Sequence, residues 1–155
     1  QTSELDTLRA ENRRIRAALR LEATDDPAEA EFKQESRRRV NDIKKWGLLF
    51  RIHANDANGQ LPDTWEQVAD QIPETERAAF VQFASNNFEV VYHGNESVVS
   101  NRVGHILFRE KQARRSPSGK WEKVYGHFDG SASTYSAPDG DFEAWEKQYI
   151  IAPQP

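Results

Sequence analysis

The sequence of 155 residues predicts an α+β fold, with a long helical region at the N-terminus followed by a small antiparallel sheet of three or four strands. Three observations support this prediction. Apolar residues, with Asn12 among them, recur every three or four positions from Leu5 to Leu19, and a second helical face of this spacing runs from Val40 to Ala54. From Asn87 onward the apolar period becomes two, which is typical of strands. Asp129-Gly130, a hairpin signal, separates the last two predicted strands.

Residues 3–22 carry a heptad pattern, which predicts a coiled-coil-like helix over residues 1–25. The seam has the spacing 3, 4, 3, 4 and consists of Leu5, Leu8, Asn12, Ile15 and Leu19. Asn12 falls at an a position, where a buried amide fixes the register and favours two strands. We therefore expect a homo-oligomer formed through this helix. Because the seam covers fewer than three heptads, an amphipathic helix packed on its own domain is the alternative.

A second helix is predicted to begin at Asp26-Pro27 and to end in the Asn-Asp-Ala-Asn-Gly run at 55–59. Asp26 can cap the helix, and proline loses no hydrogen bond at the first helical position. Gly59 supplies the left-handed conformation that ends it. One face carries Phe32, Val40, Ile43, Gly47, Phe50 and Ala54. From Trp46 onward other faces are apolar too, with Leu48, Leu49 and Ile52, so we expect the core nearly to engulf this half.

The remaining elements, in residues 62–150, are predicted to be short. A helix is expected within 62–72, with Asp63 and Glu66 at capping-box spacing, and a further helical turn or two after Pro73. Strands are expected at 88–93, 104–110, 120–128 and 131–136. A two-residue turn at Asp129-Gly130 would pair Val124 with Tyr135. A last turn or helix within 139–150 is expected to place three aromatic residues on the core: Phe142, Trp145 and Tyr149.

The composition and the scattered polar residues indicate no catalytic site. The net charge of −4 gives no overall sign of nucleic-acid binding, and the absence of cysteine excludes disulfides, thiolate nucleophiles and cysteine-ligated metals. No nucleophile elbow or glycine-rich phosphate loop occurs. The four histidines, which we interpret as isolated, are His53, His93, His105 and His127. We therefore predict no enzymatic activity and no cofactor.

Two charged groups remain as candidates for binding sites. Asp139, Asp141 and Glu143 alternate after Pro138, but three carboxylates are fewer than the 6–8 oxygens that calcium prefers. We interpret Asp141 as a helix cap instead. One hairpin end is basic, and nucleic acid or another anionic polymer is the alternative there to a solvated tip. The basic residues are Lys111, Arg114, Arg115, Lys120 and Lys123.

The stretch "VNDIKKWGLLFRIHANDANGQLPDTWEQV" at 40–68 resembles the helix and loop of bacterial pseudopilin-like domains of the verrucomicrobial and planctomycete kind. These domains are related to type II secretion and type IV pilins. "FEVVYHG" and "ILFREKQARRSPSGKWEKVYGHFDGSASTYSAPDGDFEAWEK" resemble the sheet of the verrucomicrobial version. The resemblance covers about residues 40–147 and implies a pseudopilin-like head over 26–155. Because some pseudopilins bind calcium near the C-terminal loop, it also implies a calcium site at Asp139, Asp141 and Glu143.

These observations predict a non-enzymatic structural, assembly or protein-interaction module at the cell envelope, outside the cytoplasm. The chain begins at Gln1 and has no methionine, so we expect that a preceding segment has been removed. No apolar run approaches the roughly 18 residues of a membrane span, so membrane contact would come only from that segment. A charged heptad segment stands where pilins carry their processing site and apolar helix. The alternative is a cytoplasmic accessory domain appended to a sigma-factor-like transcription regulator.

Overall fold

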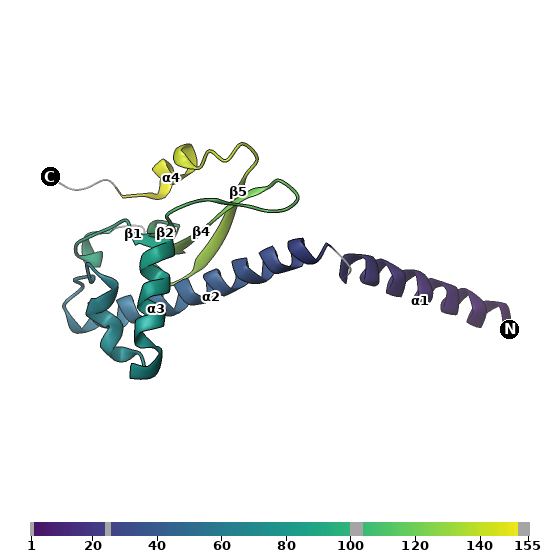
Figure 1. The fold of residues 1–155 in the computed structure, drawn as a ribbon, viewed down its shortest axis with the longest axis horizontal. Coiled ribbons are helices and arrows are strands. Elements are labelled where there is room, and N and C mark those ends of the chain that lie inside the picture. Colours follow the sequence, from purple (N-terminus) through teal and green to yellow (C-terminus); the bar gives the residue numbers. More distant parts are fainter. Residues whose placement is uncertain (1, 24–25, 100–103, 152–155) are drawn as a thin grey trace.

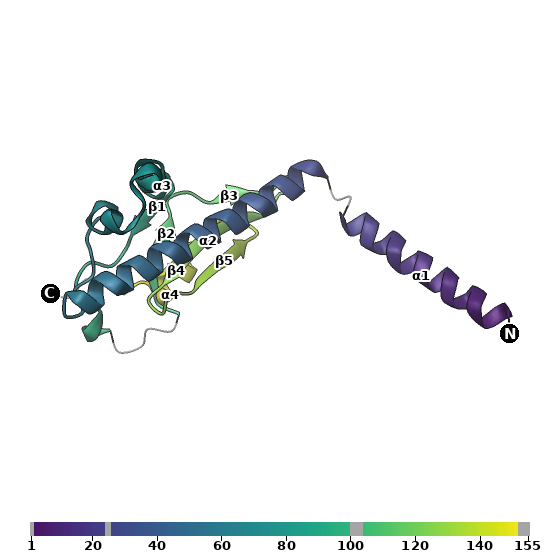
Figure 2. The same ribbon diagram turned by 90° about the horizontal axis from the view of Figure 1, so that it is seen from below.

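The predicted α+β fold is confirmed by the computed structural model, which describes residues 2–23, 26–99 and 104–151. Helix α1 (Thr2–Ala23) projects away from the rest of the chain in both views (Figures 1 and 2). Helix α2 (Pro27–Asp56) lies along one face of an antiparallel sheet, and α4 (Glu143–Tyr149) covers the other face. We call everything from residue 26 onward the body.

Local capping signals set the limits of α2 as predicted. The carboxylate of Asp26 accepts a hydrogen bond from the backbone N–H of Ala28 at 3.2 Å, and Pro27 occupies the first helical position. After the helix, Asn58 and Gly59 have φ angles of 55° and 89°. These left-handed residues turn the chain away from the helix axis, because asparagine and glycine tolerate that conformation best.

The expectation that the second half of α2 is nearly engulfed is wrong. Ile43, Trp46, Phe50 and Ala54 are buried, but Leu48 and Ile52 are 59% and 40% exposed. The sheet covers one side of α2, and the helical segments that follow α2 in the chain cover an adjacent side. The remaining side of α2 faces solvent and carries exposed apolar residues.

Two helical segments follow α2: the 3₁₀ helix η1 (Trp65–Gln71) and α3 (Glu74–Asn87). The capping box of η1 consists of Thr64 and Gln67, not of Asp63 and Glu66 as predicted. The side-chain oxygen of Gln67 accepts from the N–H of Thr64 at 3.3 Å. The capping residues differ from the predicted ones because η1 begins one residue later than expected, with Thr64 as its N-cap. Helix α3, with 14 residues, is longer than the predicted turn or two.

The described residues form a five-stranded antiparallel sheet instead of one with three or four strands. Its strands are β1 (Phe88–Val90), β2 (Ile106–Glu110), β3 (Arg114–Arg115), β4 (Trp121–His127) and β5 (Ala132–Ala137). Strand β5 pairs along β4, while β2 and β3 pair with opposite ends of it. The extra strand is the two-residue β3, which lies between the strands expected at 104–110 and 120–128. A short 3₁₀ helix, η2 (Glu96–Val98), lies between β1 and β2.

The predicted register of the β4–β5 hairpin is wrong by one residue, because Val124 pairs with Thr134 instead of Tyr135. The turn contains three residues, Phe128 to Gly130, and the N–H of His127 donates to the carbonyl of Ser131 at 2.9 Å. Gly130 has the expected positive φ, at 87°. The Asp129 carboxylate accepts from the backbone N–H of Ser131 at 3.0 Å, and this hydrogen bond stabilises the three-residue turn. Phe128, the first residue of the turn, is buried in the core.

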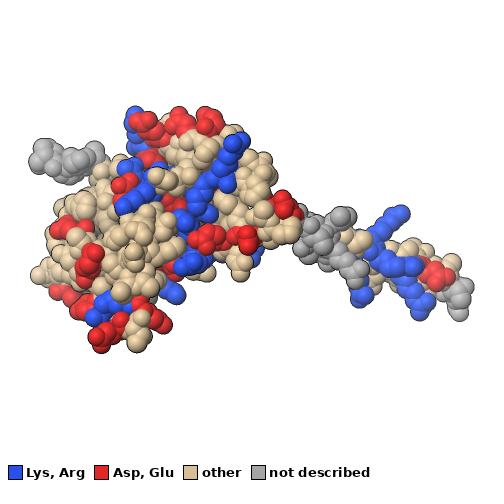
Figure 3. Space-filling model, viewed as in Figure 1, with Lys and Arg blue, Asp and Glu red and all other residues tan. Residues whose placement is uncertain are grey.

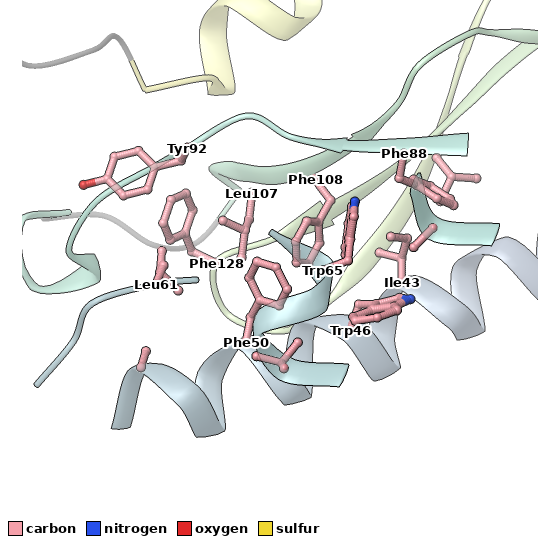
Figure 4. Close-up of a cluster of buried hydrophobic side chains, with 14 of the residues drawn as sticks. Ile43, Trp46, Phe50, Leu61, Trp65, Phe88, Tyr92, Leu107, Phe108 and Phe128 are labelled. Atoms are coloured by element: carbon pink, nitrogen blue, oxygen red, sulfur yellow. The ribbon is translucent and has the colours of Figure 1, made fainter. Parts of the chain in front are cut away.

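Two apolar clusters lie on opposite faces of the sheet. The larger one fills the space between the sheet, α2 and η1, where the ring of Phe50 meets that of Phe108 edge to face at 4.7 Å (Figure 4). The smaller one lies under α4, where the rings of Tyr135 and Trp145 stack at 4.3 Å. Phe142, Trp145 and Tyr149 pack on the domain as predicted, but they belong to this second cluster.

Candidate functional site

The apolar seam of α1 is exposed along the part of the helix whose side chains are described. All side chains from Ser3 to Ala17 are exposed, and Leu5, Leu8 and Ile15 retain 53%, 61% and 54% of their accessible surface. Helical spacing brings these three residues and Asn12 onto one face. The side chain of Leu19 lies outside the described part. The described seam therefore forms an apolar stripe that no other part of the described chain covers.

Exposure of this stripe bears on the alternative that α1 packs on its own domain. Helix α1 has 22 residues, and Figures 1 and 2 show it directed away from the sheet. In proteins most of the stability of a helix comes from the packing of its apolar face. In this arrangement no described part of the body covers the apolar face of α1.

A second exposed apolar surface lies on the body, between α2 and the η1–α3 segment. It is a hollow of about 290 Å³ with an apolar majority in its lining. The lining residues are Leu48, Leu49, Ile72, Pro73 and Phe80, together with Lys45, Gln71 and Glu76. Its lining offers a contact surface but no convergent set of polar groups of the kind that orients a small ligand.

Two carboxylates that are buried in the body each form ion pairs with two basic side chains. The first is Glu110, at the end of β2, which is fully buried on the α2 side of the sheet. It accepts from Arg39 at 2.7 Å, from Arg114 at 3.1 Å and from the backbone N–H of Val124 at 2.7 Å. Arg114 also donates to the hydroxyl of Ser36 at 2.9 Å. This network ties α2 to the sheet.

The second buried carboxylate is Glu146 of α4, on the opposite face of the sheet. It accepts from Arg109 at 2.9 Å, from the hydroxyl of Tyr125 at 2.8 Å and from Lys123. Burial opposes ionisation, but the hydrogen bonds from Lys123 and Tyr125 and the charges of Lys123 and Arg109 outweigh it and lower the pKa of Glu146. Burial and the neighbouring Glu146 also raise the pKa of Tyr125. This network holds α4 in place.

These two networks separate the basic residues that the sequence placed at one hairpin end. Arg114 and Lys123 lie on opposite faces of the sheet and are engaged by Glu110 and Glu146. Lys111 donates to the carbonyl of Ser85. The guanidinium of Arg115 lies 5.7 Å from the ring of Trp121, and Lys120 is exposed. The structure therefore does not bring the five cations together as one patch.

The three calcium candidates act as backbone caps and ion-pair partners. Asp139 accepts from the N–H of Asp141 at 3.1 Å, and Asp141 accepts from the N–H of Glu143 at 3.1 Å. Asp141 thus bonds to the first residue of α4, although Phe142 occupies the N-cap position instead of Asp141. The Glu143 carboxylate lies 3.3 Å from the ammonium of Lys147. Across the described ranges, no group of three or more aspartate, glutamate or histidine residues has a geometry that could hold a metal ion.

His105 and His127 lie in neighbouring segments, where the His127 ring is 3.3 Å from the carbonyl of His105, and His93 contacts another part of the structure. The ring of His127 lies 3.1 Å from the carbonyl of Gly104 and 2.7 Å from the hydroxyl of Ser133. His105 lies 3.3 Å from the carbonyl of Tyr149, and His93 lies 3.3 Å from the carboxylate of Asp63. His127 and His105 thus tie strand and loop backbones together. Their partners are backbone and hydroxyl groups, which suit a structural role.

Sequence reasoning did not identify Glu110 and Glu146 as buried centres. A local signal for Glu110 was present, because it lies two positions after Phe108 and therefore on the same face of the strand, where a buried charge requires a partner. Glu146 follows Trp145 on a helix that also carries the exposed polar residues Glu143, Lys147 and Gln148, and nothing in that pattern distinguishes Glu146 from them.

No protein-family model, curated protein or solved structure matches this chain. Within the described residues, no helix combines the length and apolar character needed to cross a bilayer. The candidate functional surface is therefore identified from the structure itself, and it is the seam of α1.

Proposed function

We propose that this protein is a non-enzymatic assembly module that self-associates through the seam of α1 and presents its body to further partners. The observation that carries this proposal is the exposure of Leu5, Leu8 and Ile15 on one face of a projecting helix. Large apolar side chains aligned on a solvent-exposed helix are characteristic of an interaction site.

The expected strength of this association follows from the exposed area. Full burial of one such side chain is worth about 1.5–3 kcal/mol, and the helix already covers about half of each. Burial of the remaining exposed half of all six side chains in a pair would therefore contribute roughly 5–9 kcal/mol to the free energy of association. Association costs about 4–15 kcal/mol in lost freedom of motion, so the net affinity is weak without further contacts. Assembly should depend strongly on protein concentration.

We also propose that the body is a pseudopilin-like head and that the protein works at the cell envelope, outside the cytoplasm. Supporting this is the arrangement of α2, whose second half packs along an antiparallel sheet and ends in the sharp loop at 55–59. The pairing of buried cations with Glu110 and Glu146 supports a structural rather than a catalytic role for these charges.

Sedimentation equilibrium of the full chain over a wide concentration range tests the association. The wild-type chain should shift from monomer to a larger species as its concentration rises. Leu8→Glu/Ile15→Glu should remain monomeric, because it places two charges in the seam. Ala10→Glu/Ala17→Glu is the matched control, because it adds the same two charges to the opposite face of α1. A wild-type chain that is monomeric at millimolar concentration would refute the proposal.

A further inference from the structure

We propose that α1 pairs with α1 of a second copy in parallel orientation and in register, as a two-stranded coiled coil. This inference rests on the proposed self-association and goes beyond it by fixing the partner's orientation. It is carried by the charged residues beside the seam and by the single polar residue within it.

The charges that flank the seam are arranged for a parallel pair. With Asn12 at position a, Glu4 and Glu11 fall at g, while Arg9 and Arg16 fall at e of the following heptads. In a parallel, in-register coiled coil, each g residue faces the e residue five positions later on the partner. Glu4 would then face Arg9 of the second copy, and Glu11 would face Arg16. Twofold symmetry repeats both contacts, so every such pair joins opposite charges.

An antiparallel pair would bring like charges together. In that arrangement g residues face g residues, and e residues face e residues. Glutamates would lie opposite glutamates and arginines opposite arginines along both sides of the seam. Like charges at these positions are destabilising.

Asn12 favours the same orientation for a separate reason. In a parallel pair, position a packs against position a, so the two Asn12 amides can hydrogen-bond to each other. In an antiparallel pair, position a packs against position d, which carries Leu8 and Ile15. The amide would then be buried against an aliphatic side chain, at the cost of an unsatisfied polar group.

The flanking charges are available for these contacts. Glu4, Glu11 and Arg16 are exposed and take part in no ion pair within the described ranges. Arg9 lies 4.0 Å from Asp6, with 69% and 73% of the two side chains exposed. An exposed pair at that distance contributes little, so Arg9 can exchange it for a partner's carboxylate. Figure 3 shows Lys or Arg and Asp or Glu side chains next to each other on α1.

A cysteine cross-link measures the orientation directly, because the native chain contains no cysteine. In the full-chain variant Leu5→Cys, a parallel pair places both thiols in one layer, and a disulfide should form in a glutathione redox buffer. In an antiparallel pair the two residues would be about 15 Å or more apart along the helix axis. A disulfide needs Cα atoms within about 7 Å. Thr7→Cys, on the outer face, is the matched control and should not cross-link.

Charge reversal provides an independent measurement of the orientation. Glu4→Lys/Glu11→Lys should raise the dissociation constant of a parallel pair about tenfold or more at low salt, because four attractions become repulsions. Adding Arg9→Glu/Arg16→Glu to the same chain should restore the affinity. An antiparallel pair would not be weakened by the first change, since lysine pairs would merely replace glutamate pairs.

The outcomes separate this inference from the proposed function. Cross-linking at residue 5, together with weakening and restoration by charge reversal, would support it. Association that depends on Leu8 and Ile15 but shows neither effect would overturn the parallel orientation and leave self-association standing. A chain that stays monomeric would overturn both.

Discussion

Replacing Ile43 by alanine tests how α2 is held against the sheet. Ile43 is 1% exposed, and its Cγ2 lies so close to Gly126 that a Cβ built there would come within 2.6 Å. The glycine lets strand and helix approach, and Ile43 fills the space between them. Ile43→Ala should therefore lower the free energy of unfolding by about 2–5 kcal/mol, since it removes buried methyl groups and leaves a cavity. That is a large part of the 5–15 kcal/mol typical of a domain.

Ile52→Ala is the matched control, because it makes the same chemical change on the same helix at a residue that is 40% exposed. It should cost less than about 1 kcal/mol. Urea denaturation of the two full-chain variants at one protein concentration, followed by tryptophan fluorescence, gives both values if the m-values agree. Equal losses for the two variants would refute the assignment of the Ile43 face to the core.

Two further predictions concern the turn and the α4 network. Gly130→Ala should destabilise the protein by about 1 kcal/mol or more in thermal unfolding, because φ is 87° there. Gly47→Ala, whose added Cβ would meet Gly130 only at an ordinary 3.6 Å, should not. Because the pKa of Glu146 is lower in the folded protein than its ordinary value of 4.5, its ionised form stabilises the fold. This stabilisation is fully present at pH values above 4.5 and is lost as the pH falls through the lowered pKa of the folded state. Glu146→Gln should therefore be less stable at pH 6 and show a shallower acid slope in urea titrations; an unchanged slope would contradict the network.

Features set by neighbouring residues could be predicted from the sequence. The start of α2 depends on Asp26 and Pro27, and its end depends on Asn58 and Gly59, so all the necessary chemistry lies within a few positions. The positive φ of Gly130 was predictable for the same reason. The hairpin register was not, because it depends on Asp129 bonding to Ser131 and on Phe128 finding a place in a distant core.

Burial of particular helix faces could not be predicted, because it depends on where other elements lie. Leu48 and Phe50 are similar in hydrophobicity and two positions apart, yet only Phe50 faces the sheet. The position of α3 decides which neighbouring face is covered, and no local pattern specifies it. The seam of α1 shows the converse case. Its spacing was readable from the sequence, whereas its exposure became known only from the structure.

The distribution of ion pairs also bears on which surface is open to a charged partner. In the body, Arg39 and Arg114 are held by Glu110, and Lys123 by Glu146, all largely buried. Removing one member of a buried pair leaves an uncompensated charge and costs about 3–5 kcal/mol, so a partner cannot easily recruit these cations.

On α1 the balance is different. The Arg9–Asp6 pair is exposed, and an exposed pair is worth only about 0–1 kcal/mol. A partner helix can therefore rearrange these charges at little cost. Because the same helix carries the uncovered apolar stripe, apolar attraction and charge selection would act on one surface in the proposed pair. Salt should then weaken the choice of orientation more than the association itself, since screening reduces the flanking ion pairs and leaves apolar burial intact.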